Sequence, residues 1–413
     1  MDIAQSLESS SGQPIRCIDM HTTGEPTRII YSGFPALSGT LLEQRDQAKQ
    51  QYDHIRKRLM LEPRGHDGMY GAIIRPTTEL VSSGVADIGV LFIHNDGFST
   101  MCGHATLALG RFLIDTHDLQ VFPCRNRLQF HKESRSIALT IHAPCGLVRV
   151  SVPVSPDGRK SDPTRPVSFL STPAFASALR LDIDIPESIR DVFPKKKKSI
   201  TLDVSYGGAF YALIDVRELG FPGLKSISLD EVTRCIQSLK PYLMSRSEIR
   251  AAVQHPDDSR LSFLYAIMLV DSDSDSNSNL NTSFSESDST RVNPDNILGS
   301  ETGLCYFAGA QIDRSPTGSC VSARMALAYA KRKRGIGQRW AYNSLVSNAF
   351  GDGVFTAEIV DEVKINREDG GVTPGVVVKV EGKAYYTGSV TLVLEEEDGI
   401  SSEGFTMVGV ANF

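Results

Sequence analysis

The chain has 413 residues, 41% hydrophobic and 22% charged, which is the composition of an ordinary globular protein with room for about two or three domains. Its formal net charge of -6 provides no broad positive field, which argues against a nucleic acid as the main partner. Seven scattered cysteines, never spaced as C-x-x-C, favour neither a disulfide framework nor a zinc site and indicate reduced thiols in a cytoplasmic protein. No membrane partner is expected, because no apolar run approaches the roughly 18 residues that a membrane-spanning helix needs.

Short strands and one helix are expected near the N-terminus. Residues 1–14 are polar and predict a flexible tail. Residues 15–19 and 27–31 predict a pair of strands around a polar loop. A capping-box sequence, followed by apolar residues at helical spacing, predicts a surface helix over residues 41–61.

A candidate site follows at the end of the next strand. The strand-like run over residues 86–94 leads into residues 101–104 (Met-Cys-Gly-His). Residues 103–115 are apolar on nearly every face, which predicts a buried helix. Residues 137–142 and 147–152 then predict a hairpin around an Ala-Pro-Cys-Gly turn.

The second half of the chain contains a similar site. Residues 199–216 predict a strand pair that is broken at a Tyr-Gly-Gly turn. Residues 271–290, nearly all Asp, Ser and Asn, predict a disordered insertion, since they cannot bury enough apolar surface. The strand-like run over residues 303–312 leads into residues 313–319 (Asp-Arg-Ser-Pro-Thr-Gly-Ser) and a helix expected over residues 318–334.

The two halves repeat one plan, in which a strand, a turn with a polar side chain and a buried helix are flanked by antiparallel strands. We predict an N-terminal half over residues 15–170, completed by a C-terminal hairpin in residues 370–410 with its strands at 376–394. The C-terminal half is predicted over residues 171–369. Both helix starts would offer backbone N–H groups to an anion, and the first would also stabilise a thiolate.

Five short motifs together carry a family resemblance. They lie at residues 21–28, 62–67, 101–104, 206–208 and 313–316. In this order, over roughly residues 15–395, they resemble the signatures of the proline racemase family. The resemblance implies an α/β (α+β) fold of the diaminopimelate-epimerase type: two similar halves, each a mostly antiparallel curved sheet around a buried helix, enclosing the ligand between them. It also implies no cofactor, a small imino acid as ligand and, by analogy, a homodimer.

The chemistry implied by the resemblance depends on two positions. In the racemases and epimerases of the family, a cysteine from each half serves either face of the ligand's Cα. Cys102 matches the first cysteine, whereas the second position is Thr317. Threonine is a poor proton donor or acceptor near neutral pH, so inversion with two bases should fail. The Cys/Thr combination resembles the family members that dehydrate trans-3-hydroxy-L-proline.

The resemblance therefore implies a hydro-lyase that forms Δ1-pyrroline-2-carboxylate, with Cys102 as the base that removes the Cα proton. The expected ligand contacts are the backbone N–H groups of Gly103, His104, Gly318 and Ser319 to the carboxylate, Asp313 to the ring ammonium, and Thr317 to the departing hydroxyl. Two alternatives stay open: a proline racemase or 4-hydroxyproline 2-epimerase, and a non-catalytic imino-acid binding protein.

Several of these residues also have a simpler structural interpretation. His104 is interpreted as a backbone donor or a packed residue and not as a base, because residues two apart do not face each other on a helix. His21 and His66 lack a spaced cluster of further ligands, so no metal site is predicted. Ala105 and Cys320 stand where the family usually has glycine; Cys320 as a displaced second acid is disfavoured because the helix would carry its thiol away from the ligand.

Overall fold

The computed structural model of the protein describes residues 2–10, 14–271, 296–366, 370–395, 397–400 and 402–410. The chain divides into two compact units. Unit 1 comprises Met1–Phe169 and Gly382–Phe413, and unit 2 comprises Leu170–Glu381. The predicted insertion, apart from Asp271, lies outside the described residues.

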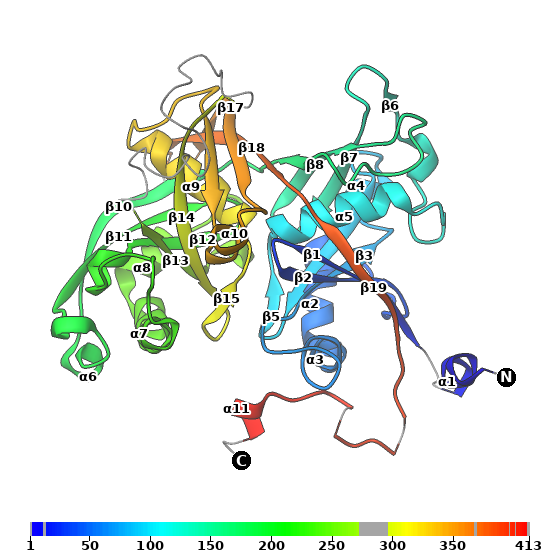
Figure 1. The fold of residues 1–413 in the computed structure, drawn as a ribbon, viewed down its shortest axis with the longest axis horizontal. Helices are drawn as coiled ribbons and strands as arrows, with labels where there is room; N and C mark the ends of the chain where they lie inside the picture. Colours follow the sequence, from blue (N-terminus) through cyan, green and yellow to red (C-terminus); the bar gives the residue numbers. More distant parts are fainter. Residues whose placement is uncertain are drawn as a thin grey trace. The chain divides into compact units, whose positions relative to one another are not determined.

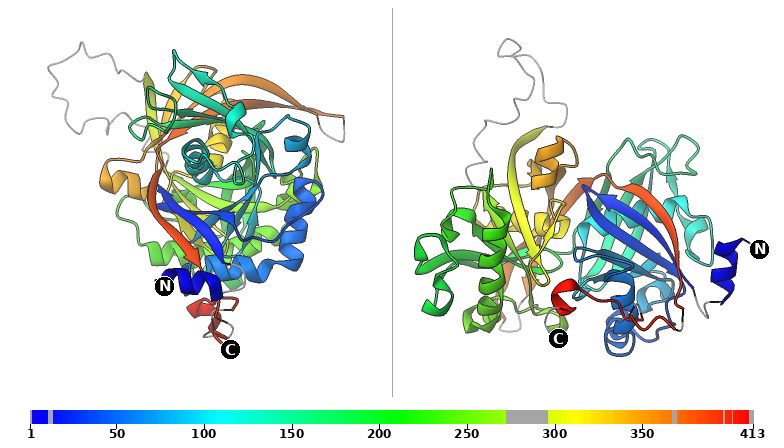
Figure 2. Two further views of the ribbon diagram at one scale, coloured as in Figure 1. Left: turned by 90° about the vertical axis from the view of Figure 1, so that its right-hand side faces the viewer. Right: turned by 60° about the horizontal axis from the view of Figure 1, so that its bottom comes forward.

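Unit 1 is a sheet wrapped around one buried helix. Its strands are β1 (Ile15–Thr22), β2 (Glu25–Ser32), β3 (Tyr70–Arg75), β4 (Ile88–His94), β5 (Gly97–Ser99), β6 (Phe130–His131), β7 (Ser136–Ala143), β8 (Gly146–Pro153) and β19 (Tyr385–Leu392). Its helices are α1 (Ile3–Ser10), α2 (Leu41–Gln51), α3 (Asp53–Met60), α4 (Glu79–Ser82), α5 (Gly103–Asp115), η1 (Arg125–Arg127) and α11 (Met407–Val410). The left view of Figure 2 shows α5 nearly end-on, with strands of the unit around it.

Unit 2 repeats this arrangement around α9 (Gly318–Ala330), which is the yellow helix labelled in Figure 1. Its strands are β10 (Phe175–Asp184), β11 (Ser199–Tyr206), β12 (Phe210–Asp215), β13 (Leu264–Asp271), β14 (Ile297–Phe307), β15 (Gln311–Asp313), β16 (Arg339–Asn343), β17 (Phe355–Asn366) and β18 (Val372–Gly382); β9 (Val167–Leu170) lies at the boundary. The other helices are α6 (Glu187–Arg190), η2 (Pro194–Lys196), η3 (Val216–Leu219), α7 (Leu229–Ser245), α8 (Ser247–Ala252), η4 (Ser259–Leu261) and α10 (Leu345–Phe350).

The pairing of the strands makes the internal repeat explicit. In unit 1, β1–β2 is antiparallel, β2–β3 parallel, β3–β4 and β4–β5 antiparallel, β4–β7 parallel and β7–β8 antiparallel. In unit 2, β11–β12, β12–β13, β13–β14, β14–β15, β14–β16 and β16–β17 follow the same sequence of directions. The predicted α/β fold of two similar halves is thus confirmed, and the two candidate motifs occupy equivalent places after β5 and β15.

Both central helices are buried, and apolar or small residues make up most of their sequences. All residues of α5 except Asp115 are buried, and so are most residues of α9. A further apolar core in each unit lies between strands and other helices, α2 and α3 in unit 1 and α7 and α8 in unit 2. The prediction of a buried helix over residues 103–115 is confirmed to the residue.

Three predicted elements need correction. The helix over 41–61 is two helices, because Tyr52 leaves the helical conformation between α2 and α3. The helix expected over 318–334 ends at Ala330, since Arg332 adopts a left-handed backbone and the N–H of Lys333 returns to Ala328 O. The strands expected to form a hairpin over 376–394 pair elsewhere, β18 with β17 and β19 with β1.

Candidate active site

Cys102 is the N-cap residue of α5. Its backbone is extended (φ -144°, ψ 111°), and its Sγ lies 3.4 Å from the backbone N of Ala105, which donates to it. The side chain is buried, with 4% of the residue exposed. The first hydrogen bond of the helix runs from Thr106 N–H to Cys102 O, so the N–H groups of Gly103 and His104 precede the helical ladder. A thiol in this place lies in the positive field of the helix N-terminus.

The His104 ring contacts the Cys102 sulfur. Sγ lies 3.2 Å from Nδ1 and 3.5 Å from Nε2. The expectation that the two side chains do not face each other is therefore wrong. That expectation assumed that both residues have helical backbone. Cys102 is the cap residue, and its backbone is extended.

The surroundings of His104 fix its ring and backbone. The ring packs edge-to-face on Tyr70, with 4.8 Å between centroids, and Tyr70 in turn packs on His94. The hydroxyl of Thr22 donates to His104 O at 3.1 Å. Residues of β1 and β3 thus contact the start of α5, and Tyr70 comes three residues after the Glu-Pro-Arg-Gly-His-Asp motif of residues 62–67.

The start of α9 is a strained turn. Thr317 is the N-cap residue and has a left-handed backbone (φ 63°, ψ 80°), which is unusual for a β-branched residue. Its hydroxyl donates to Asp313 Oδ2 at 2.7 Å, and Asp313 Oδ1 accepts the N–H of Ser315 at 2.8 Å. The N–H of Thr317 donates to Ser315 Oγ at 3.1 Å. Asp313 therefore maintains the turn, while its carboxylate keeps lone pairs for a further donor.

The backbone of α9 offers N–H groups in front of its first hydrogen bond. That bond runs from Val321 N–H to Thr317 O at 2.8 Å, so the N–H groups of Gly318, Ser319 and Cys320 precede the ladder. These groups and the helix dipole suit an anion such as a carboxylate. The predicted contacts Gly318 and Ser319 thus lie at a helix start with the required chemistry.

Tyr211 is a contact of this turn that sequence reasoning missed. Its hydroxyl lies 2.7 Å from Ser319 Oγ, and the residue is completely buried in β12. Burial raises the pKa of Tyr211 well above its ordinary value, so its hydroxyl keeps its proton. The two residues are 108 positions apart, and no motif in the sequence connects them.

The Tyr-Gly-Gly turn of residues 206–208 packs directly against the backbone of α9. A Cβ built on Gly207 would lie 2.2 Å from Ser319 O and 2.6 Å from Ala323 N. Ser205 strengthens the same contact, because its hydroxyl donates to Ala323 O at 2.8 Å. Only glycine permits this approach of the turn to the helix.

The two residues that stand where glycine was expected, Ala105 and Cys320, are both inaccessible to solvent. Burial raises the pKa of the Cys320 thiol well above its ordinary value, which removes it further from proton transfer near neutral pH. That the Cys320 thiol lies away from the ligand stays a prediction.

The histidines considered for metal binding serve the backbone instead. His21 Nδ1 accepts the N–H of Gly24 at 3.1 Å, and His66 Nδ1 accepts that of Gly68 at 3.1 Å. Among the residues that the structure describes, no group of three His, Cys, Asp or Glu side chains is arranged to hold a metal ion. None of the helices in the described part of the chain has the length and hydropathy to span a bilayer.

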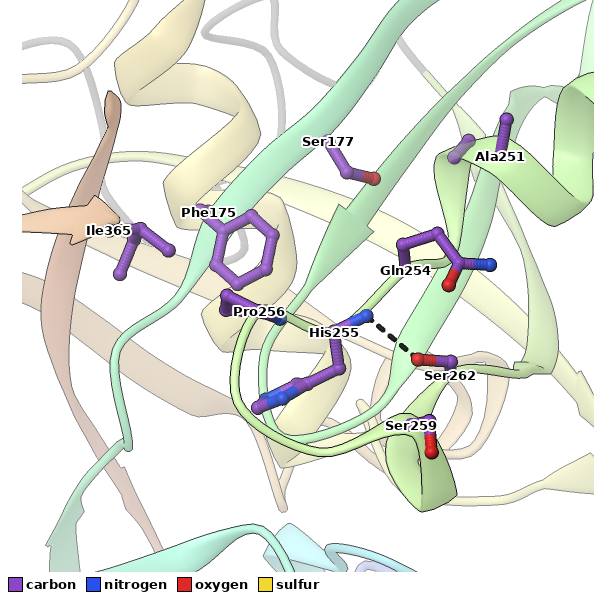
Figure 3. A pocket seen from close by; sticks show the side chains of 10 residues that line it. Phe175, Ser177, Ala251, Gln254, His255, Pro256, Ser259, Ser262 and Ile365 are labelled. Atoms are coloured by element: carbon purple, nitrogen blue, oxygen red, sulfur yellow. Dashed lines mark hydrogen bonds between the residues drawn. The ribbon is translucent and has the colours of Figure 1, made fainter. Parts of the chain in front are cut away.

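Unit 2 also contains a pocket of about 360 Å³, lined by residues of β10, β17, the end of α8 and the segment after it. Figure 3 shows it with His255, whose backbone N–H donates to Ser262 Oγ at 2.9 Å. The Nδ1 atom of His255 accepts the N–H groups of Asp257 and Asp258. These polar groups thus stabilise the loop itself, and the lining includes no residue of the predicted site.

Comparison with known proteins gives consistent matches over almost the whole chain. The family model described as proline racemase matches residues 17–406. The trans-L-3-hydroxyproline dehydratase of Pongo abelii is 38% identical over 398 residues, which is 96% of each chain. The trans-3-hydroxy-L-proline dehydratase of Homo sapiens is 37% identical over the same length and the same shares.

A solved structure supports the fold. The crystal structure of a probable proline racemase from Agrobacterium radiobacter K84 superposes with a TM-score of 0.73, covering 95% of this chain and 97% of that one. Its sequence identity is 21%, so this likeness concerns the arrangement of strands and helices.

Proposed function

The chain belongs to the proline racemase family, and we propose that it is a trans-3-hydroxy-L-proline dehydratase. The reaction is the removal of water to give Δ1-pyrroline-2-carboxylate, without a cofactor. The observation that carries the proposal is the unequal pair of helix starts, a thiol at Cys102 and an alcohol at Thr317. The relatives from Pongo abelii and Homo sapiens, named as dehydratases of this imino acid, support it.

Cys102 is assigned as the base. Its sulfur lies at the positive end of α5, accepts a backbone N–H and contacts the His104 ring at 3.2 Å, and each of these favours the thiolate. The thiolate takes the proton from Cα. Negative charge then develops on Cα and the carboxylate. It is removed from the ring when the 3-hydroxyl departs.

The ligand's charged groups are assigned to the two helix starts. The N–H groups of Gly103 and His104 in α5, and of Gly318 and Ser319 in α9, have the chemistry to stabilise a carboxylate as its charge grows. Asp313 is assigned to the ring ammonium. That all of these groups serve one ligand is a prediction from the sequence.

The alternatives are less well supported by the residues present. A racemase or epimerase of the two-base type needs a second proton donor, and the hydroxyl of Thr317 donates to Asp313. A non-catalytic binding protein would have no need of a thiol and an imidazole in contact at a helix start.

The decisive experiment is an incubation of the purified protein with trans-3-hydroxy-L-proline in D2O, followed by NMR. The expected result is Δ1-pyrroline-2-carboxylate, and its loss in Cys102→Ser. Parallel incubations use L-proline and both 4-hydroxyproline isomers; inversion of any of these with no pyrroline product from the 3-hydroxy compound would instead establish an isomerase. Ligand-induced thermal stabilisation without turnover or Cα exchange would indicate a binding protein.

We also infer a cytoplasmic location from the scattered cysteines and a homodimer from the family resemblance. Light scattering coupled to size exclusion tests the second inference, with a mass near twice the chain's 45.1 kDa expected.

A further inference from the structure

We propose that Cys102 is both the base and the acid of this dehydration: its thiol returns to the departing 3-hydroxyl the proton that its thiolate took from Cα. His104 supports the sulfur in both steps, and Thr317 supplies no proton. This inference rests on the proposed function and goes beyond it, because it assigns the proton donor for the leaving group.

The stereochemistry of the substrate supports a donor on the side of the base. In trans-3-hydroxy-L-proline the hydroxyl and the carboxylate lie on opposite faces of the ring. At Cα the proton lies opposite the carboxylate, so this proton and the 3-hydroxyl share one face. A base that reaches the Cα proton is thus beside the leaving oxygen, which is bonded to the neighbouring carbon. The elimination is syn, and one group on one face can perform both transfers.

The contacts of Cys102 suit a group that must exist as thiolate and as thiol in turn. The thiolate is stabilised by the N–H of Ala105 at 3.4 Å and by the His104 ring, with Nδ1 at 3.2 Å. The thiol, once formed, keeps the imidazole as a hydrogen-bonding partner, since neutral histidine has one donor and one acceptor nitrogen. The sulfur therefore has a stabilising partner in either protonation state.

Thr317 is arranged differently. Its hydroxyl is directed at Asp313 Oδ2, with 2.7 Å between the oxygens, and both atoms belong to the same buried turn. Asp313 also accepts the N–H of Ser315, so its carboxylate is fixed in this orientation. To protonate a leaving group, Thr317 would have to abandon the charge-assisted hydrogen bond that holds a strained backbone. The alcohol fits a structural role in the turn better than that of an acid.

The step balances without any further reactant. The thiolate takes the Cα proton, and the electron pair of the broken C–H bond forms the C2=C3 double bond as the C3–O bond breaks. The departing oxygen keeps the electron pair of the C–O bond and takes the proton from the Cys102 thiol. The oxygen then leaves as water. The thiolate is restored, and the enamine product tautomerises to the cyclic imine by moving its N–H proton to C3.

The first test compares the two 3-hydroxy isomers with the wild-type protein in D2O. In cis-3-hydroxy-L-proline the hydroxyl lies on the face away from the Cα proton. We expect deuterium at its Cα but dehydration at least about 100-fold slower than for the trans isomer, since a positioned acid contributes about 10² to 10⁴ in rate. Equal dehydration of both isomers would overturn the one-face relay and leave the proposed function intact. No dehydration of the trans isomer would overturn both.

The second test uses Thr317→Val, with Thr317→Ser as the matched control that keeps a hydroxyl. The readout is the ratio of trans-isomer dehydration to Cα deuterium exchange in L-proline, which has no hydroxyl to lose. This ratio is insensitive to losses of folding or binding that affect both reactions alike. We expect it to stay within about threefold of wild type in both variants; a fall of about 100-fold or more in Thr317→Val alone would identify Thr317 as the acid.

The third test separates the roles of the sulfur and the imidazole. In His104→Gln we expect dehydration and Cα exchange to fall by the same factor, because the ring acts through the thiolate that serves both reactions. The pH dependence of Cα exchange should also differ between His104→Gln and wild type. A selective loss of dehydration, with exchange retained, would instead make the imidazole the acid and refute the assignment to Cys102.

Discussion

Glu301 offers the sharpest prediction on stability, because it is enclosed by two arginines behind the start of α9. Its Oε1 accepts from Arg324 Nε at 2.9 Å and from Arg334 Nη1 at 3.3 Å. Although burial raises the pKa of Glu301, the two arginines lower it to about 2, from an ordinary 4.5. Arg324 lies in α9, two turns beyond Thr317. Glu301→Gln would keep the shape of the side chain and leave two buried guanidinium groups without their anion.

The magnitude follows from the linkage of protonation to folding. A carboxyl pKa that moves from 4.5 to about 2 on folding contributes about 3 kcal/mol at neutral pH. The pKa is lowered in the folded state, so the contribution is present above pH 4.5 and is lost as the pH falls toward 2. At pH 3.5 about 2 kcal/mol should remain. The difference between wild type and Glu301→Gln should therefore shrink on acidification.

The assay is urea unfolding of wild type and variant at pH 7 and pH 3.5, followed by circular dichroism. Glu248→Gln is the matched control. A hydrogen bond from its own backbone and one from Arg246 lower the pKa of Glu248 to about 2 as well, but this ion pair is exposed. The control should change the unfolding midpoint little, because solvent screens an exposed pair. Equal destabilisation by the two variants, or a difference that grows at pH 3.5, would refute the reasoning.

Three further predictions concern close contacts, two at the start of α9 and one in the C-terminal segment. Tyr211→Phe removes the hydroxyl beside Ser319 Oγ and should lower the free energy of unfolding by about 1 kcal/mol and reduce kcat/KM, as urea unfolding and a pyrroline assay can measure. Gly207→Ala places a methyl group 2.2 Å from Ser319 O, so a loss of activity larger than in Tyr211→Phe is expected in the same assay. Gly404→Val puts a side chain at a positive φ against Glu62 O; faster proteolysis of the C-terminal segment should follow, whereas unchanged cleavage would contradict it.

The sequence predicted the central elements of the fold because their patterns are local. The apolar stretch of α5 and the hairpin of β7 and β8 are both recognisable within a single window of residues. Boundaries were predicted less well where one residue left the regular conformation, as Tyr52 does between α2 and α3. Helix α7 (Leu229–Ser245) was missed, although its apolar positions recur at helical spacing, and it contains Pro241.

The candidate site was predicted in its parts but not in its contacts. Cys102 and Thr317 are the N-cap residues of the two buried helices, as their motifs indicated. The contact of Cys102 with His104 escaped prediction because it depends on the non-helical backbone of one cap residue. The contact of Tyr211 with Ser319 escaped because tertiary structure alone joins two residues so distant in sequence.

The two helix starts have the same topological place and different chemistry. At the start of α5 the Cys102 sulfur accepts an N–H of its own helix and contacts an imidazole, so that a proton can be gained and lost there. At the start of α9 the hydroxyl of Thr317 turns away to Asp313, and the first N–H groups of the helix are not used for capping. Both starts offer N–H groups to an anion, and only the start of α5 also has a group suited to proton transfer. A racemase needs a proton-transfer group at both starts, since it must work from two faces. A syn elimination needs only one proton-transfer group, so the start of α9 can bind the ligand's carboxylate without a thiol.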